Sequence, residues 1–182
     1  MTERPLAIVP RKGLVEVFTG DGKGKTSAAM GVVIRSLGHG FRVCIIQFMK
    51  ISYPYGEQKT LTCFPNVNIT AFGRPSFVDP NDVKEEDIKE AKKALEAARK
   101  AVLSGNYDLV VLDEVNVAVA WGLLEVDKVV KLINDKPEAL ELILTGRYAD
   151  PEVVKLADLV TEMLSIKHPF ARGVVGRPGI DY

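Results

Sequence analysis

A short glycine-rich stretch near the N-terminus has the residue types that bind phosphate. Residues 20–26 read GDGKGKT, after an apolar run at Leu14–Phe18 and before a helix-prone segment. Glycines let backbone N–H groups turn toward an anion, and the start of the following helix adds the positive end of its dipole. Lys25 can pair with phosphate oxygens, and the Thr26 hydroxyl can ligate Mg²⁺. The pattern predicts a strand, a phosphate-binding loop and a helix that bind a nucleoside triphosphate.

The loop departs from the common pattern G-x-x-x-x-G-K-[ST] at its first position, where Thr19 replaces glycine. A plain glycine-rich turn is the weaker interpretation, because Gly24-Lys25-Thr26, the strand before it and the helix after it coincide. An extra lysine, Lys23, lies inside the loop. The residues predicted to contact the nucleotide here are Thr19, Gly20, Gly22, Lys23, Gly24, Lys25, Thr26 and Ser27.

Two carboxylates follow a second apolar run. Asp113 and Glu114 come directly after Leu109–Leu112, and four consecutive apolar residues are typical of a strand buried on both faces of a parallel sheet. The carboxyl ends of such strands form the edge where open α/β sheets bind ligands. We therefore expect Asp113 and Glu114 to complete a Mg²⁺ site with Thr26, directly or through water. A helix cap after a core strand is the alternative.

Strands and helices alternate along the chain, which predicts an α/β fold with a mostly parallel sheet, helices on both faces and three layers. The expected strands are Leu14–Phe18, Arg42–Phe48, Val67–Ala71, Leu109–Asp113, Leu140–Leu144 and Leu159–Met163. The expected helices are Thr26–Leu37, Lys84–Ser104, Glu125–Ile133 and Pro151–Ala157. Two loops, residues 50–58 and 72–82, should emerge at the same sheet edge as the phosphate loop.

Composition and charge narrow the function. The 182 residues contain 24 Lys plus Arg and 24 Asp plus Glu, so the zero net charge does not favour a nucleic-acid partner. No apolar run could span a membrane and residues 1–13 lack a signal-peptide pattern, so we expect no membrane partner and a cytoplasmic protein. The cysteines and histidines lack the spacing of a zinc site. Cys44 lies in an apolar run and should be a buried, reduced thiol.

From Gly13 to Tyr182 the chain resembles the ATP:cob(I)alamin adenosyltransferases of the CobA/BtuR type. That family also has threonine at the first loop position, so Thr19 supports the resemblance, while the family commonly has asparagine at the position of Asp21. The segments that carry the likeness are FTGDGKGKTSAAMG (18–31), GHGFRVCIIQFMK (38–50), GE (56–57), VVLDEVNVAVAWGLL (110–124), LTGRYAD (144–150), ADLVTEM (157–163), KHPF (167–170) and GIDY (179–182).

The resemblance implies a P-loop NTPase-like, RecA-like fold and a specific reaction. Co(I) of a reduced corrinoid attacks the 5′ carbon of ATP, triphosphate leaves and an adenosyl–cobalt bond forms. Lys25, Thr26 and Glu114 would then be the catalytic candidates, and Asn116 and Arg147 would lie beside the nucleotide. The family likeness also implies a homodimer and an electron-donating reductase as partner.

The corrinoid side matches the family less well. Family members often have an aromatic–Thr–Trp cluster after the third strand, which crowds the lower face of the cobalt. Residues 72–77 read FGRPSF, so Phe72 or Phe77 would take that place, and Trp121 is expected to pack in the core. We expect one domain, 1–182, with an N-terminal extension, 1–12, and a C-terminal segment, 166–182, docked near the site.

Two other functions stay open at this point. A P-loop small-molecule kinase or an ATPase would release ADP instead of triphosphate. A non-catalytic corrinoid carrier would bind the corrinoid without converting it. No arginine-rich lid or zinc-binding cysteine pair is visible to favour a nucleoside kinase.

Overall fold

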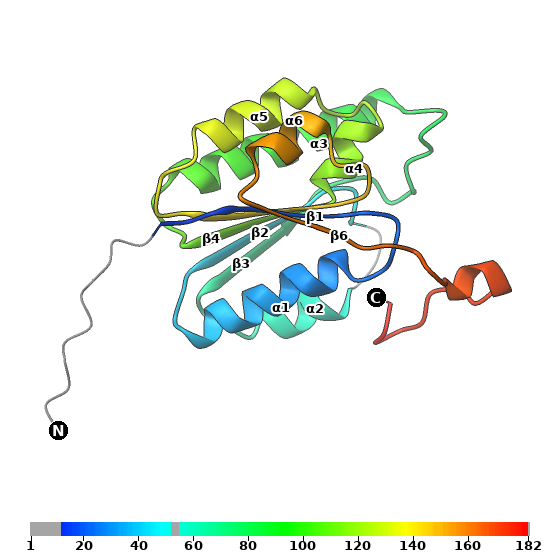
Figure 1. The fold of residues 1–182 in the computed structure, drawn as a ribbon, viewed down its shortest axis with the longest axis horizontal. Coiled ribbons are helices and arrows are strands. Elements are labelled where there is room, and N and C mark those ends of the chain that lie inside the picture. Colours follow the sequence, from blue (N-terminus) through cyan, green and yellow to red (C-terminus); the bar gives the residue numbers. More distant parts are fainter. Residues whose placement is uncertain (1–11, 52–54, 182) are drawn as a thin grey trace, which may run out of the picture.

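The computed structural model describes residues 12–51 and 55–181. Six strands form one sheet with the order β3-β2-β4-β5-β1-β6, and each neighbouring pair is parallel (Figure 1). The strands are β1 (Val15–Thr19), β2 (Val43–Gln47), β3 (Val67–Ala71), β4 (Leu109–Asp113), β5 (Glu141–Thr145) and β6 (Leu159–Glu162). The helices are α1 (Lys25–Gly38), α2 (Gly56–Leu61), α3 (Glu85–Leu103), α4 (Val115–Ala120), α5 (Val126–Asn134) and α6 (Pro151–Leu156), and a 3₁₀ helix, η1, covers Pro169–Arg172.

Helices cover both faces of this sheet. Helices α1 and α2 lie on one face, and α3, α4, α5 and α6 lie on the other (Figure 1). The buried side chains accordingly form two clusters, one on each side of the sheet. The predicted three-layer α/β fold of the P-loop NTPase-like kind is confirmed. In the described part of the chain, no helix has the length and apolar character needed to cross a membrane.

The position of each strand in the sheet follows from its side chains. Strands β2 and β4 are buried at every position, as their unbroken apolar runs predict for central strands covered on both faces. Strand β3 alternates between half-buried and exposed residues, and β6 is exposed throughout, so these two form the sheet edges. Cys44 of β2 is a free, buried thiol as predicted, and burial raises its pKa to about 11.

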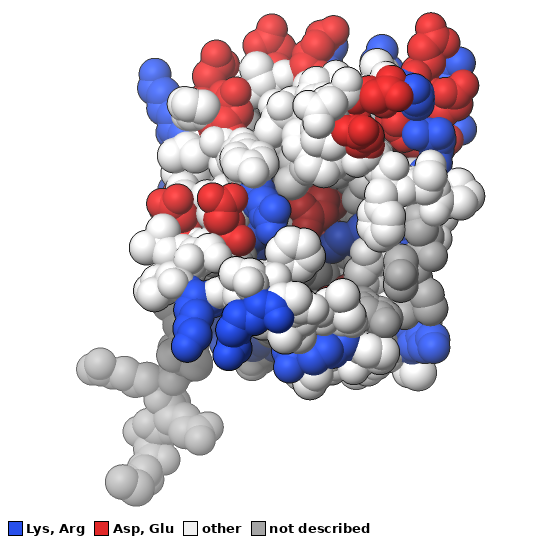
Figure 2. Space-filling view, turned by 90° about the vertical axis from the view of Figure 1, so that its right-hand side faces the viewer, with Lys and Arg blue, Asp and Glu red and all other residues white. Residues whose placement is uncertain are grey.

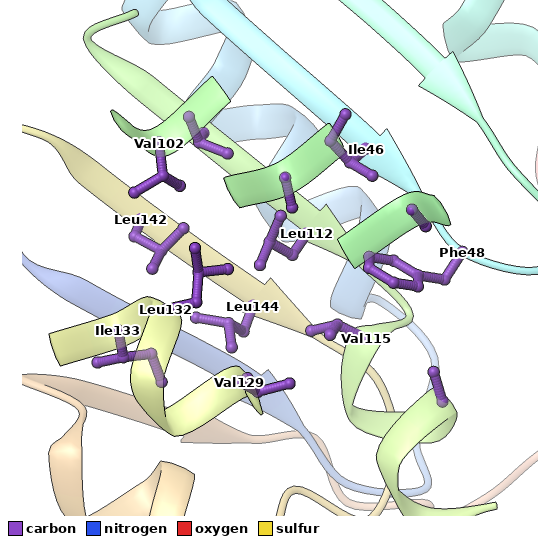
Figure 3. Packing of buried hydrophobic residues seen from close by; sticks show 14 of the residues in the cluster. Ile46, Phe48, Val102, Leu112, Val115, Val129, Leu132, Ile133, Leu142 and Leu144 are labelled. Carbon is purple, nitrogen blue, oxygen red and sulfur yellow. The ribbon is translucent and has the colours of Figure 1, made fainter. Parts of the chain in front are cut away.

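Helix α3 packs closely on the sheet because its inner face carries small residues. Ala91, Ala94 and Ala98 are buried against the strands, whereas Ile88 and Leu95, which belong to the predicted apolar stripe, are only half-buried. Figure 3 shows side chains from β2, β4 and β5 facing those of α3 and α5 in this layer. The labelled residues include Ile46, Leu112, Leu142, Leu144, Val102, Leu132 and Ile133.

The predicted strands and helices are all present, with ends within about one residue of their expected positions. Two short α-helices, α2 and α4, and the 3₁₀ helix η1 were not predicted. The stretch 50–58 was expected to be a loop, which is wrong from Gly56 onward because α2 begins there, and residues 52–54 lie outside the described part. Helix α4 follows the carboxylates of β4 directly. Of the expected N-terminal extension, residues 1–11 also lie outside the described residues.

An ion pair attaches the loop after β3 to the start of α3. Arg74 donates from Nε and Nη2 to the two carboxylate oxygens of Asp87, at 2.6 and 2.9 Å, and the Lys84 backbone N–H donates to the same carboxylate at 3.0 Å. The Asp87 side chain is only 1% exposed. This contact fixes the loop 72–82, which carries Phe77.

We expect Asp87→Asn to lower the free energy of unfolding by about 2–3 kcal/mol at neutral pH, because it weakens hydrogen bonds to a buried charge. The hydrogen bond from Arg74 holds the pKa of Asp87 below its ordinary value of 3.8. The stabilisation is therefore complete above pH 3.8 and disappears as the pH falls through the lower folded-state pKa. Urea denaturation at pH 7 and at stepwise lower pH measures both effects.

Asp127→Asn, at an exposed position in the first turn of α5, is the matched control and should lower the free energy of unfolding by less than about 1 kcal/mol. The role given to Asp87 is wrong if Asp87→Asn and Asp127→Asn have the same unfolding free energy at pH 7. It is also wrong if the difference between the two variants persists at the lowest pH reached.

Candidate active site

The carboxyl ends of the parallel strands bring most of the predicted residues to one edge of the sheet. Strand β1 leads into the glycine-rich loop, β4 ends at Asp113, β5 leads to Arg147, and Lys50 follows β2. A cavity of about 470 Å³ opens there, and Figure 2, which faces this side of Figure 1, shows acidic and basic side chains around a recess. The predicted residues that line it are Gly22, Lys23, Gly24, Lys25, Thr26, Ser27, Phe77, Glu114 and Arg147.

The glycine-rich loop, residues 19–26, wraps around the side chain of Lys25. The Lys25 ammonium donates to the backbone carbonyl oxygens of Gly20 and Gly22, both at 2.7 Å. Lys25 is buried, and burial lowers the pKa of its ammonium below the ordinary value of 10.5. Gly24, with φ 114°, places the loop directly before the N-terminus of α1. The loop thus has the shape that presents backbone N–H groups and a lysine to an anion.

Two glycines allow this loop to touch the chain after β6. The Gly22 N–H donates to the Met163 carbonyl at 2.6 Å. A Cβ added at Gly22 would lie 2.7 Å from the carbonyl oxygens of Met163 and Leu164, and one at Gly20 would lie 2.5 Å from the Met163 oxygen. These neighbours are backbone atoms and cannot rotate away, so only glycine fits at both positions.

We expect Gly22→Ala to lower the free energy of unfolding by about 1–3 kcal/mol, since the backbone shifts needed to admit a methyl group have that cost. The displaced loop should also bind ATP at least about tenfold more weakly, because N–H groups aimed at one anion lose their alignment. Thermal unfolding and equilibrium binding of ATP measure the two effects.

Gly31→Ala is the matched control, because no atom lies within 4 Å of a Cβ added at Gly31. In the interior of α1 this change should stabilise the protein by about 0.5–1 kcal/mol. Equal behaviour of the two alanine variants would contradict the tight fit at Gly22.

Asp113 is the centre of a buried hydrogen-bond network. Its Oδ1 accepts from the Thr26 hydroxyl at 2.9 Å and the Thr145 hydroxyl at 2.7 Å. Its Oδ2 accepts from the Gln47 amide at 3.2 Å and the Lys50 ammonium at 2.7 Å. Burial alone would raise the pKa of Asp113, but Lys50 and the two hydroxyls outweigh it and lower that pKa, so the group is a carboxylate.

Glu114 has an unusual backbone conformation beside this network. Its φ is 67°, and its N–H donates to the Thr145 hydroxyl at 3.0 Å. It occupies the cap position of α4 but makes no side-chain capping bond, and it lines the cavity. Burial raises the pKa of Glu114 above its ordinary value. In the described residues, the other non-glycine positive φ values belong to Met49 and Tyr148, and all three residues line the cavity.

The oxygen atoms of Thr26, Asp113 and Glu114 are of the kind that Mg²⁺ prefers. No group of three or more His, Cys, Asp or Glu side chains suited to a metal ion occurs in the described part of the chain. A site here would therefore combine two carboxylates and one hydroxyl with oxygens of the nucleotide, as Mg²⁺ sites that bind triphosphates usually do. The residues present fit that ion.

Two predicted residues act on the loop after β5 and do not line the cavity. The buried Asn116 donates from Nδ2 to the Gly146 carbonyl at 3.3 Å, and the Thr19 hydroxyl accepts from the Ala149 N–H at 3.2 Å. Both contacts hold the loop that carries Arg147. Arg147 is exposed at the rim, and within the described residues it forms no ion pair.

The two phenylalanines that were predicted as alternatives lie in different surroundings. Phe72 packs against the core, while Phe77 is 75% exposed and lines the cavity. Trp121 packs against the core as expected, and it also lines the cavity beside Val117. Sequence reasoning did not select Trp121 for the site because it follows Glu114 in an apolar segment typical of a core.

The C-terminal segment contacts the glycine-rich loop. The Lys23 ammonium donates to the Asp181 carboxylate, which also accepts from Arg177 Nε at 3.0 Å. These two partners hold the pKa of Asp181 well below its ordinary range. His168 and Ile180 of the same segment line the cavity.

Comparison with known proteins identifies the family. A family model described as ATP:corrinoid adenosyltransferase BtuR/CobO/CobP matches residues 11–182. The chain belongs to this family. A corrinoid adenosyltransferase from Pseudomonas aeruginosa is 36% identical over 189 residues, which cover 99% of this chain and 93% of the relative. Corrinoid adenosyltransferases from Escherichia coli K12 and Salmonella typhimurium are 36% and 35% identical over 172 residues, covering 94% of this chain and 86% of each relative.

Membership in the ATP:corrinoid adenosyltransferases confirms the resemblance seen in the sequence and makes the chain a transferase. Lys50 is the main site residue that the sequence analysis did not select for this adenosyltransferase. The available signal was a charged residue three positions after a predominantly apolar strand, because the carboxyl ends of such strands form the ligand-binding edge.

Proposed function

We propose that this chain acts as one domain that transfers the 5′-deoxyadenosyl group of ATP to the Co(I) of a reduced corrinoid and releases triphosphate. One observation carries the proposal. The loop residues Lys25 and Thr26 share a single cavity with the carboxylate of Glu114 and with an apolar wall that includes Phe77 and Trp121. The cavity thus offers a phosphate-binding part and an apolar part next to each other.

The reaction needs little proton chemistry from the protein. A Co–C bond forms as the C5′–O5′ bond of ATP breaks, cobalt supplies both electrons of the new bond, and the electron pair of the broken bond leaves with triphosphate. The protein must hold the reacting atoms in line, stabilise the negative charge on the leaving oxygen and exclude water. These are tasks of position and charge.

The positive groups of the cavity suit the leaving triphosphate. Backbone N–H groups of residues 23–27, including those at the start of α1, would surround its oxygens, with Lys23, Lys25 and Arg147 as the cationic side chains. Asn116 and Thr19 would keep Arg147 in place through the loop contacts described above. Each such donor stabilises the transition state more than the bound ATP, because the charge grows as triphosphate departs.

Thr26, Asp113 and Glu114 would hold Mg²⁺. A bound Mg²⁺ supplies Lewis-acid stabilisation of the negative charge on phosphate oxygens. The Thr26 hydroxyl donates its proton to Asp113, which leaves the oxygen lone pairs of Thr26 for a cation.

The apolar wall would face the corrinoid. A corrinoid macrocycle is too large for a cavity of about 470 Å³, so the nucleotide would fill the cavity and the corrinoid would cover its mouth. Phe77, which is mostly exposed and lines the cavity, would contact it, whereas Phe72 packs against the core. An electron-donating reductase, a homodimer and a cytoplasmic location belong to the same proposal, supported by the family likeness.

The decisive experiment mixes the purified protein with cob(I)alamin, ATP and Mg²⁺ without oxygen, follows the corrinoid absorption spectrum and assays the phosphate product. We expect a light-sensitive adenosylated corrinoid and one triphosphate per turnover. ADP without a spectral change would replace the proposal with a kinase or an ATPase. A bound corrinoid with neither product would leave a carrier.

A further inference from the structure

The ammonium of Lys50 contacts all three residues assigned to Mg²⁺. Its Nζ donates to Asp113 Oδ2 at 2.7 Å and to the Thr26 hydroxyl at 3.2 Å, and it lies 3.8 Å from Glu114 Oε1. It also lies 5.2 Å from the centre of the Tyr55 ring. The Lys50 side chain is only 11% exposed. A positive charge of the protein itself is therefore centred on the oxygens that a divalent cation would use.

Asp113 has no acceptor position left while Lys50 is there. A carboxylate has about four lone-pair positions, and those of Asp113 accept from Thr26, Thr145, Gln47 and Lys50. A metal ion that binds Asp113 directly must therefore displace one of these donors. At Thr26, the Lys50 ammonium occupies one of the two lone-pair positions of the hydroxyl oxygen and leaves the other.

Lys50 is the donor that can leave. Gln47 and Thr145 belong to β2 and β5 and are fully buried within the sheet, so neither can move without disturbing the strands. Lys50 follows β2, and its flexible stem ends in a compact ammonium that lines the cavity. Its ammonium forms ion pairs with the carboxylates of both Asp113 and Glu114.

We propose that Lys50 is an internal counter-ion, which occupies the carboxylate pair until a divalent cation and the triphosphate enter together and displace it. The inference rests on the magnesium site of the proposed function. A divalent cation that binds without nucleotide must displace the Lys50 ammonium from Asp113, and the displaced ammonium then has no anionic partner in a confined site. A cation that arrives with a nucleotide supplies that partner, because the released ammonium lies in the cavity that holds the triphosphate. Lys50 would then add one more positive charge to the leaving group.

The test measures the binding of Mn²⁺ by electron paramagnetic resonance, first without nucleotide and then with ATP. Wild-type protein should bind Mn²⁺ alone weakly, and ATP should tighten the binding at least about a hundredfold. Lys50→Met removes the competing charge while keeping an apolar stem, so it should bind Mn²⁺ alone at least about tenfold more tightly than wild type. The factor by which ATP tightens Mn²⁺ binding should therefore be smaller in Lys50→Met than in wild type.

Lys23→Met is the matched control. It also removes one positive charge from the cavity lining, but the Lys23 ammonium pairs with Asp181 and not with the metal-site residues. Binding of Mn²⁺ alone should not change in Lys23→Met. An equal gain in both variants would overturn the proposal, because the effect would then be one of overall charge. If Lys50→Met does not fold, as judged by circular dichroism, Lys50→Gln keeps a hydrogen-bond donor for Asp113 and removes only the charge.

The outcomes separate this inference from the magnesium site on which it rests. Tight binding of Mn²⁺ with ATP but no gain in Lys50→Met without ATP would leave the metal site standing and overturn the role of Lys50. No specific Mn²⁺ binding to wild type, even with ATP, would overturn both, and would make Lys50 a permanent substitute for the metal ion.

Discussion

Lys25→Ala is expected to lower the rate of adenosyl transfer by about a hundred- to a thousandfold, the usual cost of removing one donor from a developing negative charge. The Lys25 ammonium lies inside the loop and lines the cavity. Its burial lowers its pKa but leaves a strong donor for phosphate. The rate of corrinoid adenosylation under single-turnover conditions measures the effect directly.

The variant also loses two hydrogen bonds to loop carbonyls, so its folding must be checked by thermal unfolding. The cavity admits water, which can replace those bonds, and we expect a folded protein. Lys59→Ala removes an exposed lysine of α2 and should leave the rate unchanged. A folded Lys25→Ala protein with the wild-type rate would remove Lys25 from the site.

Asp113→Asn is expected to have the largest effect on stability, lowering the free energy of unfolding by about 3–5 kcal/mol. The change removes a fully buried carboxylate and leaves the Lys50 ammonium without its closest partner. It also places an amide N–H₂ next to groups that donate to Asp113, among them the Thr145 hydroxyl. Urea denaturation followed by circular dichroism gives the free energy.

A double variant shows whether the loss comes from the ion pair. Asp113→Asn with Lys50→Met removes both charges, so part of the lost stability should return, because the ammonium that lost its closest partner is no longer present. Asp127→Asn, at the surface of α5, again serves as the control. If Asp113→Asn is as stable as wild type, Asp113 is not the centre of the network.

The sequence was sufficient to predict the parts of the molecule that rest on local patterns. The apolar run of β4 predicted a strand buried on both faces, and the glycine-rich loop predicted the strand before it and the helix after it, which are β1 and α1. The two α-helices that were missed have six residues each and the 3₁₀ helix η1 has four, too short for an apolar period to be visible. Helix α4 also has the sequence VNVAVA, whose β-branched residues favour a strand in isolation.

The sequence predicted contacts of the candidate site less completely where they join separate segments of the chain. Lys50 meets Asp113 because β2 and β4 pair in parallel with Gln47 opposite Asp113, a register that depends on the whole sheet. Phe72 and Phe77 could not be distinguished, because the direction of their loop depends on the contact between Arg74 and Asp87. Trp121 was expected in the core, and its second contact with the cavity depends on where α4 ends.

The left-handed residues around the cavity have a consequence for engineering. Met49, Glu114 and Tyr148 each adopt a conformation that disfavours L-amino acids by about 1–2 kcal/mol, and glycine would relieve that cost. A screen for heat-resistant variants should therefore select glycine substitutions at these three positions. Glycine substitutions at these positions would remove side chains from the wall of the cavity. They would therefore lengthen the half-life of the protein at high temperature but lower its catalytic rate. Thermostability without loss of activity should instead be sought at exposed positions of α1 that do not line the cavity, such as Gly31.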